Sequence, residues 1–144
     1  MIVLIQRVSE ASIDIGCTTV ASISRGLVIF LAVESGDNST VCKKLCTKVI
    51  GYRIFSDVHG KLNLNVSQAK GEILVVSQFT LSADTTKGLR PSLRAADPEI
   101  AEPLYELFVE QIRAFGIPTQ TGVFGAHMGV KLVNDGPTTF MLKS

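Results

Sequence analysis

The chain has 144 residues, 46% of them hydrophobic, and this size and composition predict a single domain, residues 1–144, with a core of its own. Its 14 basic and 13 acidic residues nearly cancel, so overall charge argues neither for nor against a nucleic-acid partner. Gln6 and Arg7 break the apolar N-terminal run, which excludes a membrane span or a signal core; we expect a soluble, cytoplasmic protein with no membrane partner.

The first third of the chain predicts strands followed by a helix. Buried apolar runs predict strands over residues 2–8 and 27–33, and alternating polarity predicts half-exposed strands over 11–15 and 20–24, joined by short turns into a meander. A helix is expected over about residues 40–53, with its lysines off the apolar face. That apolar face consists of Val41, Leu45, Val49 and Tyr52.

The middle of the chain predicts short strands and then a surface loop. Extended runs at 54–57 and 62–64 flank a turn, and the strongest strand of this region lies at 71–77. Residues 83–95 are polar and basic and contain glycine and proline, which is typical of a surface loop.

A second helix is predicted to start at Asp97, Pro98 and Glu99, which supply an N-cap, an N1 proline and a first-turn acid. Its expected apolar stripe is Ile100, Leu104, Leu107, Phe108, Ile112 and Phe115. Three extended runs then close the chain, at 119–124, 128–133 and 138–142. The order of elements predicts an α+β fold with a largely antiparallel sheet and two covering helices.

Two polar motifs stand out against this apolar background. Ser77, Gln78 and Thr80 bring two hydroxyls and an amide to the end of a buried strand, where they either cap the sheet edge or form a pocket floor that holds a carbonyl or a ribose. Gly136 and Pro137 join two extended runs and predict either an ordinary hairpin turn or a rigid stretch of backbone that presents its carbonyls to a ligand.

Common catalytic and metal motifs are missing from the sequence. A Ser77, His127 and aspartate triad remains open without motif support for the histidine, and Thr80 has no base nearby in the sequence. The cysteines are odd in number, and Cys42 and Cys46 have no second pair of ligands at metal-site spacing. We therefore expect three reduced thiols, no metal and no cofactor.

Basic residues gather in two runs that contain no acid, so a basic face on a nearly neutral protein is possible. Each run is compatible with contact to a phosphate backbone and also with a simple solvated surface. The candidate nucleic-acid contacts are Lys43, Lys44, Lys48, Lys87, Arg90 and Arg94.

Residues 77–81 (SQFTL) and 134–140 (NDGPTTF) resemble the two signature motifs of the D-aminoacyl-tRNA deacylases, the D-tyrosyl-tRNA deacylase family. The resemblance runs along the whole chain, through the segments 6–8, 71–76, 87–92 and 121–122. Two positions depart from the family pattern, Leu93 in place of an aromatic and Thr138 in place of the commoner valine, and both could alter the pocket lining or its flank.

This resemblance implies a barrel-like, mainly antiparallel fold, a homodimer, and hydrolysis of the ester between a D-amino acid and the 3′-terminal ribose of tRNA. It implies a cis Gly136-Pro137 bond that enters the partner's active site and excludes L side chains. Because the Gly-Pro pair would exclude substrates by their side chain, glycine, which has none, would not be excluded, so glycyl-tRNA is an expected second substrate. The expected catalytic residues are Ser77, Gln78, Phe79 and Thr80, and the expected pocket residues are Leu81, Met128 and Asn134.

Two other classes of protein stay open on the sequence alone. One is an esterase with a serine or threonine nucleophile at Ser77 or Thr80, and the other is a dimeric module that binds a small molecule without catalysis. In the resembling family the ribose 2′-hydroxyl of the substrate is thought to assist the attacking water, which agrees with the missing protein base.

Overall fold

The computed structural model describes residues 1–144 and contains two α-helices, one short 3-10 helix and eight strands. The strands are β1 (Ile2–Ile15), β2 (Thr18–Ile23), β3 (Gly26–Ala32), β4 (Phe55–Ser56), β5 (Leu62–Leu64), β6 (Glu72–Ser77), β7 (Thr119–Thr121) and β8 (Gly129–Lys143). The helices are α1 (Ser39–Gly51), the 3-10 helix η1 (Phe79–Ser82) and α2 (Pro98–Ala114). No helix is both long enough and apolar enough to cross a membrane.

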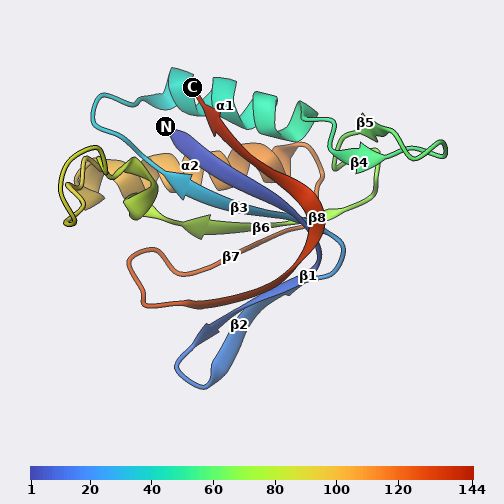
Figure 1. Cartoon of the computed structure of the whole chain (residues 1–144), viewed down its shortest axis with the longest axis horizontal. Helices are drawn as coiled ribbons and strands as arrows, with labels where there is room; N and C mark the ends of the chain where they lie inside the picture. Colours follow the sequence, from blue (N-terminus) through green and yellow to red (C-terminus); the bar gives the residue numbers. More distant parts are fainter.

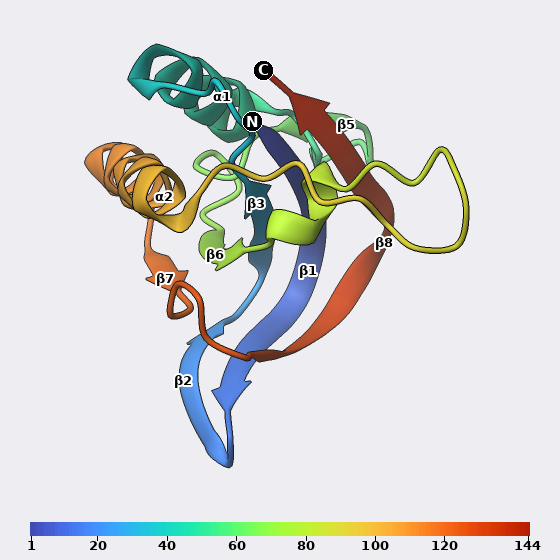
Figure 2. The same cartoon turned by 90° about the vertical axis from the view of Figure 1, so that its left-hand side faces the viewer.

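The main sheet is built around β1, which pairs with a different partner on each edge. Its first half pairs with β3 and its second half with β2, while β8 follows nearly its whole length on the other edge; all three pairings are antiparallel. The sheet continues from β3 to β6 and β7 through parallel pairs. Figures 1 and 2 show this curved, barrel-like sheet with α1 and α2 together on one face. The predicted α+β fold class is therefore confirmed, with two parallel pairings added.

The core lies between the sheet and the two helices. It is a cluster of 24 buried residues to which β1, β3, β6, α1 and α2 all contribute, with Phe55 and Phe108 among its largest fully buried side chains. Burial of this apolar surface stabilises the fold and places β6 beneath α2. The predicted stripe of α2 is wrong at its two ends, because Ile100 and Phe115 are each 54% exposed. The buried residues of α2 are Ala101, Tyr105, Phe108, Val109 and Ile112.

The N-terminal strands are fewer than predicted. The runs 2–8 and 11–15 form one continuous strand, because β8 stays paired across the interval between them. The register shifts between Val8 and Glu10, so this interval is an irregularity in the ladder and not a turn. A meander of four separate strands is therefore corrected to one long central strand with β2 and β3 sharing an edge.

The hairpin interpretation of Gly136-Pro137 is also wrong. The two extended runs predicted on either side of it belong to the single strand β8, and both pair with β1. Gln6 pairs with Thr139 and Val8 with Asn134, so residues 135–138 all lie opposite Arg7 as a large bulge. The Gly136-Pro137 peptide bond is cis, as the resemblance implied. Gly136 and Pro137 are exposed, whereas Thr138 is only 3% exposed.

All three cysteines are free thiols. Cys42 and Cys46 are buried on α1 against α2, where their Sγ atoms lie 3.5 Å and 4.0 Å from the carbonyl oxygens of Leu104 and Phe108. Burial raises the pKa of Cys42 to about 11 and that of Cys46 to about 12, so both thiols stay protonated at neutral pH. They therefore serve as small apolar core side chains.

Candidate active site

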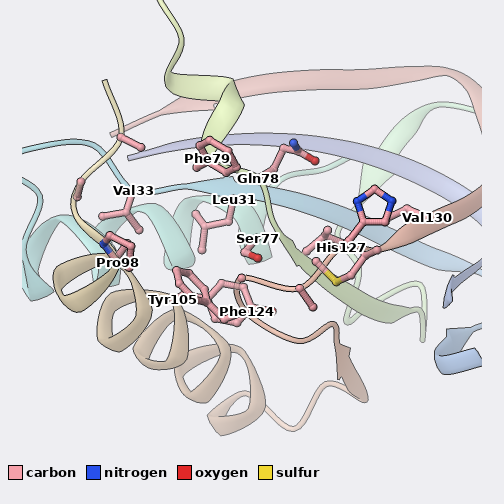
Figure 3. A pocket seen from close by; sticks show the side chains of 17 residues that line it. Leu31, Val33, Ser77, Gln78, Phe79, Pro98, Tyr105, Phe124, His127 and Val130 are labelled. Carbon is pink, nitrogen blue, oxygen red and sulfur yellow. The ribbon is translucent and has the colours of Figure 1, made fainter. Parts of the chain in front are cut away.

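A pocket lies where β6 ends, between η1, the start of α2 and the loop that joins β7 to β8. It has a volume of about 470 Å³, and 12 of its 17 lining residues are hydrophobic. Its lining includes Ser77, Gln78 and Phe79 from the first predicted motif. Figure 3 shows Gln78 and His127 toward one end of this pocket, and Pro98 with Tyr105 toward the other. The pocket thus has a polar end and an apolar end.

The polar end is shaped by the way the chain leaves β6. The N–H of Gln78 donates to the Leu31 carbonyl at 2.8 Å, which extends the parallel β3–β6 pairing by one residue. The chain then winds into η1, whose first internal hydrogen bond runs from the Leu81 N–H to the Gln78 carbonyl at 3.2 Å. The amide groups of Phe79 and Thr80 precede that bond, so they have no partner within the helix. A cluster of hydrogen-bond donors therefore lies just past the strand.

Side chains in this motif form hydrogen bonds to one another and to the local backbone. The Gln78 Nε2 donates to Thr80 Oγ1 at 2.6 Å, and the Ser82 hydroxyl donates to the Phe79 carbonyl at 2.7 Å. Gln78 is half-buried and Phe79 is 56% exposed. Thr80 and Leu81 lie on η1 but outside the pocket lining, so Thr80 reaches the pocket only through its contact with Gln78.

The apolar end is a rigid wall formed by α2 and the β7–β8 loop. The Tyr105 hydroxyl donates to the Val75 carbonyl at 3.1 Å, and burial raises the pKa of Tyr105 to about 12. Its ring lies 5.7 Å from that of Phe124, centroid to centroid, in a tilted arrangement. Because Tyr105 stays neutral and fixed, it serves this pocket as a wall and not as an acid or base.

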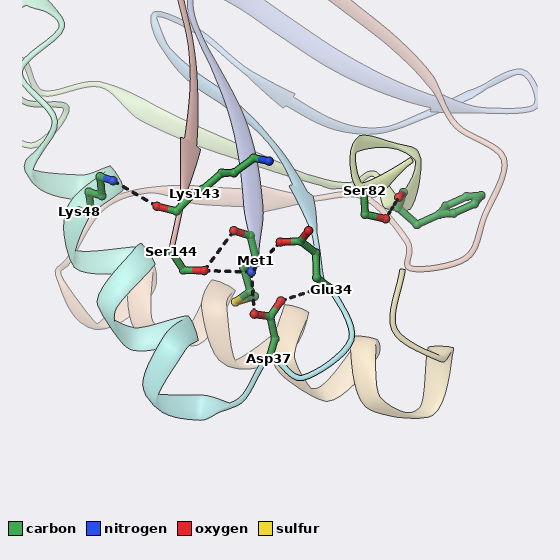
Figure 4. A network of polar contacts seen from close by, with 8 residues as sticks. Met1, Glu34, Asp37, Lys48, Ser82, Lys143 and Ser144 are labelled. Atoms are coloured by element: carbon green, nitrogen blue, oxygen red, sulfur yellow. Dashed lines mark hydrogen bonds and ion pairs between the residues drawn. The ribbon is translucent and has the colours of Figure 1, made fainter. Parts of the chain in front are cut away.

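A polar network holds the segments that form a second wall. Glu34 forms an antiparallel bridge with Ala95, and the N–H of Ala96 donates to the Val33 carbonyl at 3.0 Å. The Met1 amino group contacts the turn after β3, at 2.6 Å from Asp37 Oδ1 and 3.2 Å from Glu34 Oε2 (Figure 4). These contacts link the start of β1 to the residues that line the pocket beside α2.

Met128 lines the pocket and packs over a glycine. A Cβ added at Gly122 would lie 2.3 Å from Met128 Sδ and 3.2 Å from Ile13 Cδ1, so no side chain fits there unless Met128 moves. Gly122 and Met128 therefore fix the position of this wall together.

We expect Gly122→Ala to push Met128 into the pocket. Overpacking of this kind costs about 1–3 kcal/mol, so the protein should still fold while its KM for substrate rises severalfold. Steady-state kinetics together with a urea unfolding curve would measure both effects. Gly129→Ala is the matched control, because an added Cβ there lies 3.8 Å from its nearest neighbour, Asp14 O. Equal kinetics for the two variants would contradict the expectation.

The second predicted motif lies outside the pocket of its own chain. Asn134, Gly136 and Pro137 are exposed on β8, and none of them lines the pocket. Asn134 Oδ1 accepts a long hydrogen bond from Gln6 Nε2 at 3.4 Å, and Asp135 Oδ2 pairs with Arg7 Nε at 2.8 Å. The structure thus brings residues 77–79 together with Met128 but leaves the Gly136-Pro137 motif elsewhere on the surface.

The candidate tRNA contacts form two separate groups. Lys43, Lys44 and Lys48 are exposed on α1, whereas Lys87, Arg90 and Arg94 belong to the loop that projects on another side of the molecule in Figure 2. That loop leads directly into Ala95 and Ala96 of the pocket wall. An ion pair between Arg94 and Asp84 closes its base. Only the loop group therefore lies in a segment continuous with the pocket.

Asp84 organises this loop. Its Oδ1 accepts the Thr86 N–H at 3.0 Å and the Thr86 hydroxyl at 2.6 Å. Hydrogen bonds from Thr86, followed by the charge of Arg94, hold the pKa of Asp84 below its usual value. The two residues that depart from the family pattern, Leu93 and Thr138, do not line the pocket of this chain.

Sequence reasoning missed most of the pocket lining. Tyr105, Phe124, Ala95 and Ala96 belong to no motif, and only the fold brings them beside residues 77–79. The sequence suggests His127 only as part of a triad with Ser77. Both residues do line the pocket, but no hydrogen bond joins them, so the geometry of an activated serine is missing.

The fold is shared by two solved structures. The c-Myc DNA Unwinding Element Binding Protein matches with a TM-score of 0.95 and 36% identity, covering 100% of this chain and 99% of that one. A probable eukaryotic D-amino acid tRNA deacylase matches with a TM-score of 0.84, covering 99% of this chain and 98% of that one, at 14% identity. This second likeness shows the fold alone.

The D-Tyr-tRNA(Tyr) deacylase family model matches residues 4–143, and the chain belongs to this family. Among its relatives, D-aminoacyl-tRNA deacylase of Aeromonas hydrophila is 59% identical over 144 residues, and that of Proteus mirabilis is 57% identical over 144 residues. Each alignment covers 99% of both chains. That of Pectobacterium atrosepticum is 55% identical over 145 residues and covers both chains completely.

Proposed function

We propose that this protein hydrolyses the ester of D-aminoacyl-tRNA, releasing the free D-amino acid and tRNA, as a single deacylase domain over residues 1–144. The observation that carries the proposal is the pocket at the end of β6, where Gln78 and backbone amides stand at one end and an apolar wall at the other. Membership of the deacylase family supports the same reaction. Aminoacyl-tRNA is a cytoplasmic substrate, so we place the enzyme in the cytoplasm.

In this proposal the pocket binds the aminoacylated end of the tRNA. The terminal adenine lies against the apolar wall that includes Tyr105 and Phe124, and the ester carbonyl faces Gln78. Water bonds to the carbonyl carbon, and negative charge develops on the carbonyl oxygen. The amides near Phe79 and Thr80, with Gln78, stabilise that oxyanion through fixed donors. The bond to the ribose 3′-oxygen then breaks, and that oxygen takes the proton that water loses.

No protein side chain need act as the nucleophile. Cys42 and Cys46 are buried and protonated, Tyr105 has a raised pKa, and Ser77 has no hydrogen bond to a base. Assistance from the substrate's own 2′-hydroxyl fits such a pocket. Hydrolysis of D-tyrosyl-tRNA with a 2′-deoxy 3′ end tests this: a large loss of rate supports substrate assistance. Covalent trapping of Ser77 or Thr80 by an acyl-directed inhibitor would favour an esterase instead, and no hydrolysis of either substrate would favour a binding module.

We further propose that the enzyme works as a homodimer in which Gly136 and Pro137 of one subunit close the pocket of the other. The motif is exposed on a bulge of β8 and is absent from the pocket of its own chain, so it is available to a second copy. Its backbone carbonyls would hold the substrate α-amino group and leave no space for an L side chain. Rejection by a wall separates mirror images better than attraction, which gives only about 1–3 kcal/mol per methyl-sized difference.

This wall would not reject glycine, which has no side chain to exclude, so glycyl-tRNA is proposed as a second substrate.

We also assign the approach of the acceptor stem to Lys87, Arg90 and Arg94, because their loop continues into the pocket wall. The lysines of α1 lie on another side of the molecule and are less suited to that contact.

Gly136→Ala tests the selecting wall. An added Cβ meets only the Asn134 Nδ2 at 3.2 Å, at the flexible end of a side chain, so the monomer should fold normally. In the dimer the new methyl group intrudes on the space for the substrate's amino group. We expect kcat/KM for D-tyrosyl-tRNA to fall at least about tenfold, or ~1.4 kcal/mol, with L-tyrosyl-tRNA still at background.

The ratio of D- to L-tyrosyl-tRNA deacylation is the quantity to measure, with Gly129→Ala of the same strand as the control. An unchanged ratio for Gly136→Ala would rule out the wall. Sedimentation of the wild-type protein tests the dimer separately, since a monomer that retained full selectivity would exclude a contribution from a partner.

A further inference from the structure

We propose that His127 binds the phosphodiester that joins the terminal adenosine of the substrate to the rest of the tRNA, and so helps to anchor the nucleic acid at the pocket. This inference rests on the proposed function. It assigns to one side chain a part of recognition that neither signature motif supplies.

His127 is the only side chain of the lining that gains a positive charge. The other ionisable member of that lining is Tyr105, whose hydroxyl is committed to the Val75 carbonyl. The remaining lining residues are apolar or carry neutral hydroxyl and amide groups. An anion entering this pocket therefore has one cationic partner available in it.

The location of His127 suits a group that passes through the pocket's opening. It is exposed in the loop that joins β7 to β8, and Figure 3 places its ring away from Pro98 and Tyr105 at the apolar end. A nucleoside whose base lies against that apolar end must extend its 5′ side outward, because the polymer continues beyond the pocket. The 5′-phosphate is the first charged group on this path.

Charged residues on the neighbouring elements do not compete for this role. Next along β8, Lys131 Nζ lies 2.6 Å from Asp14 Oδ2 of β1. The hydrogen bond from Lys131, together with one from Thr19, holds the pKa of Asp14 below its usual value, so the pair stays ionised and mutually neutralised. On the other elements around the pocket, β3, β6 and α2, the lining contributes no Asp, Glu, Lys or Arg.

Other parts of the substrate fit His127 less well. A protonated imidazole repels the α-ammonium of the amino acid, so His127 is unsuited to hold that group. A phosphate oxygen accepts an N–H from either the neutral or the charged ring, and the contact is stronger when the ring is charged.

A pair of minimal substrates isolates the phosphate. 2′(3′)-O-D-tyrosyl-adenosine and its 5′-phosphate differ only in that group. For the wild-type enzyme we expect a lower KM for the phosphorylated substrate. His127→Gln should raise the KM of the phosphorylated substrate about tenfold, as for one lost charge-assisted hydrogen bond, and so remove most of the KM difference between the two substrates. His127→Arg should restore the phosphate preference.

Binding of adenosine and of adenosine 5′-monophosphate, measured by calorimetry, gives the same comparison without turnover. We expect the wild-type protein to bind the monophosphate more tightly and His127→Gln to bind both equally. If both proteins treat the two ligands alike, or if His127→Gln lowers kcat equally on both minimal substrates, the inference is wrong. If neither the wild-type protein nor the variant hydrolyses D-tyrosyl-tRNA, but the wild-type protein still binds the monophosphate more tightly than adenosine, the proposed reaction fails and the phosphate site stands.

Discussion

Replacing Gly26 with alanine is expected to prevent stable folding. Gly26 begins β3 and pairs with Glu72 of β6 in the parallel part of the sheet. An added Cβ would lie 1.9 Å from the Glu72 carbonyl oxygen and 2.7 Å from its carbon, so the clash is with backbone and cannot be relieved by a side-chain rotation. The two strands would have to separate at the start of their ladder. We expect a loss of at least about 4 kcal/mol, in the range that marks a severe core or backbone defect.

Urea denaturation followed by circular dichroism measures this loss. Gly51→Ala is the matched control, because Gly51 ends α1 with no atom within 4 Å of an added Cβ. Alanine favours the helix over glycine by about 0.8–1 kcal/mol, so this variant should be equally or more stable than wild type. A Gly26→Ala protein with a wild-type midpoint would show that the β3–β6 register is not as tight as described. Disruption of this ladder should also lower activity, since the ladder ends at Ser77 beside the pocket.

Removing the Gln78 side chain is expected to produce the largest loss of activity in a folded protein. Loss of one donor that stabilises an oxyanion lowers kcat about 10²–10³-fold in other enzymes. We expect a loss of this size for Gln78→Ala, because its amide is the side-chain donor nearest the proposed ester position. Stability should change little, since the half-buried side chain bonds only to Thr80 Oγ1, and the main-chain bond to Leu31 remains.

Single-turnover hydrolysis of D-tyrosyl-tRNA separates this chemical effect from substrate binding. Thr80→Ala is the informative companion, because it removes a hydroxyl and the support for Gln78 while keeping the Gln78 amide. We expect its rate to stay within about tenfold of wild type. The reverse order, with Thr80→Ala inactive and Gln78→Ala active, would point to a threonine nucleophile.

Local signals in the sequence predicted local structure well. Asp97, Pro98 and Glu99 predict the start of α2, which begins at Pro98 with Asp97 at the N-cap position, although the Asp97 side chain makes no capping hydrogen bond. Asn38 shows why a cap is a reliable signal: its side chain accepts the N–H groups of Thr40 and Val41 at the start of α1. Such contacts are made within a few residues, so the sequence contains all the information they need.

The features that sequence patterns do not predict depend on pairing between residues far apart in the chain. Asn, Asp, Gly and Pro together are typical of a hairpin turn, but β1 holds both arms of β8 and makes the same residues a bulge. The two parallel pairings of β6 depend on chain crossovers that no local pattern encodes. The pocket shows the same limit: a sequence motif marks residues 77–79, whereas Tyr105 and Phe124 meet them only after folding.

The bulge in β8 also limits how this gene can evolve. Because both arms of β8 are paired with β1, a residue lost or gained between Asn134 and Thr139 must either be absorbed within the bulge or shift one arm by a single position. Such a slip turns every side chain of that arm to the opposite face, which would expose Leu142 of the core. The length of this segment is therefore constrained by the sheet, in addition to the constraint that its proposed contact with the substrate places on its residues.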